Sequence, residues 1–174
     1  MSDFFEKVSG QVDPFKKLLS YIPGFNGYVE RQNRRDADKE LRDVVARRFE
    51  EYWSRASNLQ VDLVNSGLLQ YVDDMEKAAL AMRTFIDKIS KAARGYSGMF
   101  DAVKINEKEL EAIYQFDVAF FTLGEQISSA LDNVEASLND ESALPAAIRN
   151  LNSLSRLAVE TFDRRSEVVT GSGK

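Results

Sequence analysis

The sequence predicts an all-α protein, an antiparallel bundle of four long helices with a short N-terminal amphipathic helical segment. Proline occurs only at positions 14, 23 and 145, so the long interval between the last two lacks the residue that most reliably stops a helix. Apolar residues recur along that interval at steps of three and four. No segment shows the sustained alternation of apolar and polar residues, bounded by turn residues, that predicts strands.

The chain of 174 residues has the size and composition of one ordinary globular domain. We divide it into an N-terminal amphipathic segment at 1–22, a helical bundle at 23–170 and a flexible tail at 171–174. No stretch is apolar enough over the roughly 18 to 20 residues needed to span a bilayer, and the acidic start does not resemble a secretion signal. We therefore expect a cytoplasmic protein, with a peripheral membrane location as the alternative.

The absence of both cysteine and histidine excludes several classes of chemistry. It removes disulfides, thiolate metal sites, cysteine nucleophiles, Ser-His-Asp arrangements and the Glu-x-x-His pairs of ferritin-like di-iron bundles. The net charge of −5 disfavours non-specific binding to nucleic acid, which depends on cations displacing counterions from the phosphates. We expect no enzymatic activity, no cofactor and no nucleic-acid partner.

The N-terminal segment carries apolar residues at approximately helical spacing, interrupted at Gly10 and restarted by Asp13 and Pro14. We favour the interpretation that it covers one end of the bundle. The alternative is docking on a membrane or a partner. The residues that would dock are Phe4, Phe5, Val8, Phe15, Leu18 and Leu19.

The first two long helices are predicted on either side of Gly67. Residues 28–66 contain neither glycine nor proline, and their apolar face consists of Leu41, Val45, Phe49, Tyr52, Ala56, Leu59 and Leu63. The second helix should run from about residue 68 to 94. Its inward stripe is Leu69, Val72, Met75, Ala79, Met82, Ile86, Ile89 and Ala93.

The last two helices carry start signals. Asn106 followed by Glu109 predicts an N-cap with a capping box, and Asp140 or Ser142 is expected to cap the fourth helix, with Pro145 in its first turn. Asp117 falls within the apolar stripe of the third helix, where an unpaired charge would be costly. We expect it at the edge of the stripe or paired with an arginine of a neighbouring helix.

The segment IPGFNGY leads an aromatic turn into an arginine-rich helix. Three acid-before-base pairs four residues apart favour a solvated, self-paired helix face there, and partner binding is the alternative. The aromatic residues of the turn are expected to pack on the end of the bundle, or else to anchor a partner. The candidate partner-binding residues are Phe25, Tyr28, Arg31, Arg34, Arg35 and Arg42.

The same stretch, IPGFNGY followed by RRDADKELR, resembles the start of a family of small, uncharacterised bacterial helical proteins. Members of that family have an Ile-Pro-Gly-aromatic turn followed by an Arg-Arg-x-Ala-Asp helix. The resemblance covers about 25 residues. It implies a bacterial origin and a shared helical fold, and it transfers no site, because the family has no assigned activity.

These observations favour a non-enzymatic helical scaffold or adaptor that acts through protein–protein binding or self-assembly. One alternative is a peripheral membrane-binding protein that uses the N-terminal amphipathic segment. A remote alternative is a helical bundle that holds a metal with carboxylates alone around Asp117.

Overall fold

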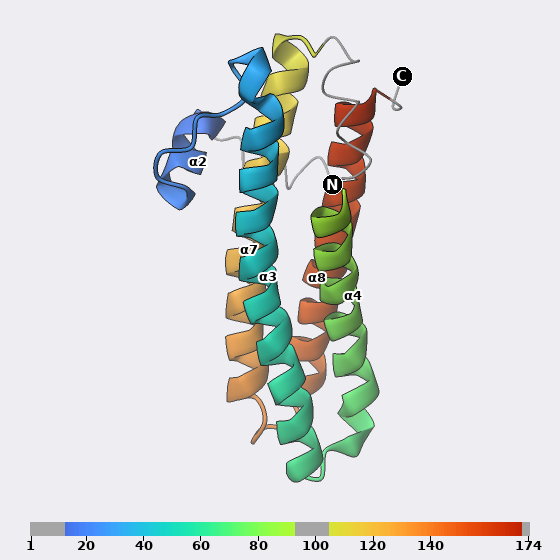
Figure 1. Ribbon diagram of the computed structural model, residues 1–174. Coiled ribbons are helices and arrows are strands. Elements are labelled where there is room, and N and C mark those ends of the chain that lie inside the picture. Colours follow the sequence, from blue (N-terminus) through green and yellow to red (C-terminus); the bar gives the residue numbers. More distant parts are fainter. Residues whose placement is uncertain (1–12, 93–104, 172–174) are drawn as a thin grey trace.

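The computed structural model describes residues 13–92 and 105–171, and within them every regular element is helical (Figure 1). The predicted all-α bundle is therefore confirmed. Its elements are α2 (Pro14–Tyr21), the 3₁₀ helix η1 (Arg31–Asn33), α3 (Arg34–Asn65), the 3₁₀ helix η2 (Leu69–Tyr71), α4 (Val72–Lys91), α7 (Glu107–Ala136) and α8 (Leu144–Thr170).

The four long helices form a ring in which α3 packs on α4 and α7, and α8 packs on the same two helices (Figure 1). Helices that follow one another along the chain run antiparallel. The neighbours α4 and α8 run parallel, since Nδ2 of Asn152 near the start of α8 donates to the carbonyl oxygen of Asp74 near the start of α4, 2.8 Å away. The parallel neighbours α3 and α7 are joined by an ion pair between Arg55 and Asp132.

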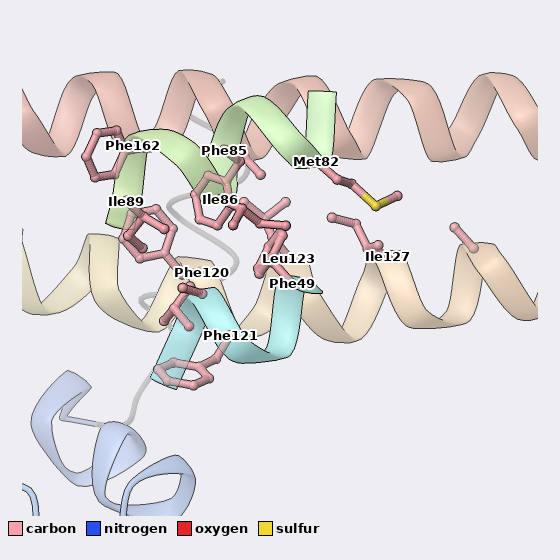
Figure 2. Close-up of a cluster of buried hydrophobic side chains, with 14 of the residues drawn as sticks. Phe49, Met82, Phe85, Ile86, Ile89, Phe120, Phe121, Leu123, Ile127 and Phe162 are labelled. Atoms are coloured by element: carbon pink, nitrogen blue, oxygen red, sulfur yellow. The ribbon is translucent and has the colours of Figure 1, made fainter. Parts of the chain in front are cut away.

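The core is centred on four phenylalanine rings, one from each long helix (Figure 2). The ring centroids of Phe49 and Phe85 lie 4.2 Å apart, and Phe85 also contacts Phe120 at 5.5 Å and Phe162 at 6.4 Å. Aromatic rings bury large areas and have preferred pair geometries, so this cluster fixes the level at which the helices meet.

The helix α3 begins later than the sequence predicted. Residues from Tyr28 up to η1 do not form an α-helix, and regular α-helix starts at Arg34 and continues for 32 residues, about 48 Å at 1.5 Å per residue. The predicted stop is confirmed, since Gly67 has a φ of +75°. Leu69 was predicted to face inward, and this is wrong: it lies in η2 before α4 begins and is 63% exposed.

The predicted capping box is confirmed at α7, where the Asn106 side chain accepts from the Glu109 amide and the Glu109 side chain accepts from the Asn106 amide. The predicted cap of α8 is wrong. Asp140 instead accepts hydrogen bonds from the amide and hydroxyl of Ser142, which stabilises the preceding turn, and α8 starts without a side-chain cap. Pro145 is in its first turn, as expected.

The short helix α2 lies against the outside of α7 (Figure 1). Asp13 caps it by accepting a hydrogen bond from the amide of Phe15, 3.0 Å away. Leu18 is completely buried, and the ring of Tyr21 stacks on Phe121 at 4.5 Å with an angle of 7° between their planes. This part of the N-terminal segment therefore covers the bundle.

Candidate functional site

The aromatic turn between α2 and α3 is folded inward. Phe25 is 2% exposed and Tyr28 is completely buried, so the predicted packing on the end of the bundle is confirmed. Gly27 makes this close approach possible. Its φ is +70°, and a Cβ atom there would lie 2.6 Å from Oη of Tyr114 and 2.7 Å from the ring of Phe15. The amide of Tyr28 donates to the same Tyr114 oxygen at 2.7 Å.

Beyond this turn, five buried polar side chains form one connected network at the end of the bundle. Tyr28 donates its hydroxyl proton to Oδ2 of Asp117, 2.6 Å away. Arg165 of α8 donates from Nε to Oδ1 of Asp117 and from Nη2 to Oδ1 of Asp38, both at 2.6 Å. Arg42 completes the chain with a hydrogen bond from Nε to Oδ2 of Asp38 at 2.7 Å.

This network joins the aromatic turn to three of the four long helices, and one further hydrogen bond reaches the fourth. Nη1 of Arg42 donates to the carbonyl oxygen of Ile89 in α4, 2.9 Å away. None of the five side chains in the network is more than a few per cent exposed. Charged groups removed from water in this way are stable only when they are paired and hydrogen-bonded.

Burial dominates the electrostatics of the network. It raises the pKa of the Asp117 carboxyl above its ordinary value, against the opposing effect of the Arg165 guanidinium. Burial, followed by the negative charge of Asp117, holds the pKa of Tyr28 well above its usual range, so its phenol keeps the proton that it donates. Two carboxylates and two guanidiniums balance within the network.

The predicted pairing of Asp117 with an arginine of a neighbouring helix is thus confirmed. Sequence reasoning missed that the arginine is Arg165, although a signal was present. Arg165 follows Phe162 by three positions and Ala158 by seven, so it continues the inward stripe of α8. Asp38 likewise precedes Leu41 by three positions and Val45 by seven on α3.

The arginine-rich segment is neither a fully solvated, self-paired helix face nor a fully accessible partner-binding face. Arg34 is 9% exposed and donates from Nε to the carbonyl oxygen of Tyr28, while Arg42 is 3% exposed. These two arginines, like Phe25 and Tyr28, are therefore not on an accessible face in this fold. Arg35 is exposed. The side chain of Arg31 lies outside the described part of the chain.

The acid-before-base pairs of this helix are also corrected. Asp38 and Arg42 do pair, but inside the protein instead of on a solvated face. Arg34 turns to a carbonyl oxygen, and Arg47 donates from Nε to the backbone oxygen of Asp43, 3.2 Å away. The rule that acids and bases four residues apart pair on an exposed face did not anticipate that polar side chains at the start of α3 are buried.

The predicted docking residues of the N-terminal segment divide into two groups. Leu18 is completely buried, and Phe15 and Leu19 are half-buried and packed against the core. Phe4, Phe5 and Val8 lie outside the described residues, so docking through them stays a prediction. Within the described ranges, none of the helices is both long and apolar enough to cross a membrane.

Two hollows lie near opposite ends of the bundle. We call the first, of about 490 Å³, the acidic groove; it lies between the starts of α2 and α7 and is lined by Asp13, Phe15, Val29, Glu107, Leu110 and Glu111, among others. We call the second, of about 640 Å³, the basic hollow; it lies between the starts of α4 and α8 and includes Tyr71, Asp74, Lys77, Arg149, Asn152 and Arg156.

Among the residues that the structure describes, no acidic side chains gather in a group that could hold a metal ion. Comparisons of the chain with protein-family models, with curated proteins and with solved structures found no match.

Proposed function

We propose that this protein is a non-enzymatic helical scaffold or adaptor that acts through protein–protein binding or self-association. The observation that carries the proposal is the enclosure of the network from Tyr28 to Arg42. The five side chains of this network face one another, at distances of 2.6 to 2.7 Å, and are closed off from solvent. A substrate would have no access to them without local unfolding.

The accessible chemistry lies on the outside of the bundle. It includes the two hollows and exposed apolar side chains, among them Val29 at 73% and Leu69 at 63%. Such surfaces suit recognition of another protein, in which apolar contacts supply affinity and a charged rim supplies orientation.

The proposal is tested by affinity capture of the intact protein from its native cell, combined with light scattering of the purified protein over a range of concentrations. The proposal predicts either a retained partner or a mass above that of one chain. A particle that stays monomeric and retains nothing contradicts it.

The choice of truncation follows from the fold. A variant without residues 1–12 removes the part of the N-terminal segment that precedes the Asp13 cap. Deletion through residue 22 would uncover Phe121 and the aromatic turn, because Tyr21 packs on Phe121 and Phe15 packs on Phe25. Capture with and without residues 1–12 therefore isolates their contribution to binding while it retains the bundle.

A further inference from the structure

The acidic groove combines apolar lining residues with charge of one sign. Its apolar lining includes Phe15, Leu110 and Val29, and its three charged residues, Asp13, Glu107 and Glu111, are all acidic. Within the described residues, no hydrogen bond or ion pair engages the side chains of Glu107 and Glu111. These carboxylates are therefore available to a cationic partner.

The basic hollow has the opposite charge. Its single carboxylate, Asp74, pairs with Lys77 at 2.6 Å. Arg149 and Arg156 lie seven positions apart on α8, hence on the same side of that helix, and neither guanidinium makes an ion pair or hydrogen bond to any described residue. The positive ends of the α4 and α8 dipoles add to the field of the two arginines.

The two surfaces lie at opposite ends of the molecule and cannot meet within one chain. The acidic groove is lined from the starts of α2 and α7 and the basic hollow from α4 and α8, and the start of α7 lies at the opposite end of the bundle from the starts of α4 and α8 (Figure 1). Each end also exposes apolar side chains, Val29 beside the acidic residues and Leu69 and Val64 near the other end.

We propose that a second copy of this chain docks head to tail, with the acidic groove of one molecule against the basic hollow of the next. The inference rests on the proposed function, whose self-association it specifies. The complementary charges orient the contact, and the exposed apolar residues of both ends are covered by it. Because the two surfaces differ, each molecule keeps one free end after docking, so assembly continues into rings or linear chains.

Charge reversal at each end tests the proposal by sedimentation velocity. One variant carries Glu107→Lys and Glu111→Lys, and the other carries Arg149→Glu and Arg156→Glu. Each places like charges in the contact, so we expect self-association to weaken about tenfold or more in each variant. The wild type should gain mass with concentration at low salt and lose it at about 1 M NaCl, where screening acts within about 3 Å.

Mixing the two variants gives the sharpest outcome. Each variant alone places like charges in its contact. In the mixture, the basic hollow of the first variant fits the acidic groove of the second, and the lysines introduced in the first variant face the glutamates introduced in the second. The equimolar mixture should therefore regain head-to-tail assembly, with the two variants alternating. A chain with all four substitutions should regain head-to-tail assembly, because its two ends are again complementary.

The control carries Glu50→Lys and Glu51→Lys, a charge change of the same size at exposed positions of α3, a helix that lines neither hollow. It should assemble no worse than the wild type. Circular dichroism melting establishes that every variant is folded, and Glu107→Gln with Glu111→Gln replaces the lysine variant if that one does not fold.

Two results overturn the inference. If the wild type is monomeric at every protein and salt concentration, self-association is contradicted. Capture of another protein would then still support the proposed function. If the wild type forms oligomers and neither charge-reversal variant changes their mass, the head-to-tail contact is contradicted, while self-association itself still stands.

Discussion

Arg165 and Asp117 face each other between α8 and α7, with Nε of the arginine 2.6 Å from Oδ1 of the carboxylate and both side chains completely buried. The same guanidinium reaches Asp38 of α3, and Asp117 also accepts the proton of Tyr28. The end of the bundle is thus held by charge pairs instead of by apolar packing alone. The aromatic turn is held by the same groups.

Replacement of Tyr28 by phenylalanine tests the attachment of the turn. Tyr28→Phe removes the donor to Asp117 and the acceptor for Nη2 of Arg165, so we expect a loss of about 1.5 to 3 kcal/mol in the free energy of unfolding. The matched control is Tyr71→Phe, whose half-exposed hydroxyl makes no hydrogen bond to the described residues, and which should change stability by less than about 0.5 kcal/mol. Urea denaturation measures both, and equal effects would contradict the network.

Alkaline titration tests the burial of the same phenol. The pKa of Tyr28 is raised in the folded protein, so the unfolded chain, with a tyrosine pKa of about 10, loses this proton first. The contribution of Tyr28 to stability is complete below pH 10 and is lost as the pH rises above it. Tyrosinate absorbance should show that at least one of the six tyrosines, Tyr28, does not titrate before unfolding. Because Tyr28 keeps its proton in the folded protein, the Tyr28→Phe variant should show the same tyrosinate absorbance as the wild type at every pH below unfolding.

Substitution of the two glycines of the aromatic turn separates backbone strain from lost space. Both have positive φ, but a Cβ at Gly24 meets nothing within 4 Å, whereas one at Gly27 collides with Tyr114 and Phe15. Gly24→Ala should therefore cost only about 1 to 2 kcal/mol of left-handed strain. Gly27→Ala should cost more than this and displace the turn. Thermal melts of the two variants give the comparison, and equal melting temperatures would show that the turn is loosely packed.

Alanine substitutions in the first half of α3 distinguish its buried arginines from its exposed ones. Arg42→Ala leaves Asp38 without one of its two cations, and breaking a buried pair costs about 3 to 5 kcal/mol. Arg47→Ala removes an exposed side chain and should cost less than about 0.5 kcal/mol. The measurement is the midpoint of urea unfolding. Arg35→Ala, at an exposed position, is the variant whose effect on partner capture is informative.

Much of the fold could be predicted from the sequence, because the spacing of apolar residues along each long helix indicates which face of the helix is buried. The capping box at Asn106 and the stop at Gly67 are local signals, and both were confirmed. The start of α3 was not predictable from the same signals. Residues 28–33 lack proline and glycine, yet they do not form an α-helix, because the hydroxyl and backbone of Tyr28 are bound by Asp117, Arg34 and Tyr114.

The interior of the site was only half predictable. Asp117 stands out because it interrupts an apolar stripe, so a cationic partner could be expected. Asp38 and Arg42 looked like an ordinary exposed pair, since the four-residue spacing is the same on a solvated face and in a buried network. The hydrogen bond from Arg165 of α8 to Asp38 near the start of α3 decides between the two. A single sequence carries that information only in the position of Arg165 on the inward stripe of α8.

The most direct test of the buried network is a double-mutant cycle with Asp117→Asn and Arg165→Met, measured by urea denaturation. Each single variant should lose about 3 to 5 kcal/mol, and the pair should lose less than the sum, with a coupling of about 1 to 3 kcal/mol. The exposed pair Lys88 and Asp163, which also joins two helices at 2.6 Å, is the control cycle and should couple by less than about 1 kcal/mol. Additive losses below about 1 kcal/mol at Asp117 and Arg165 would contradict the account.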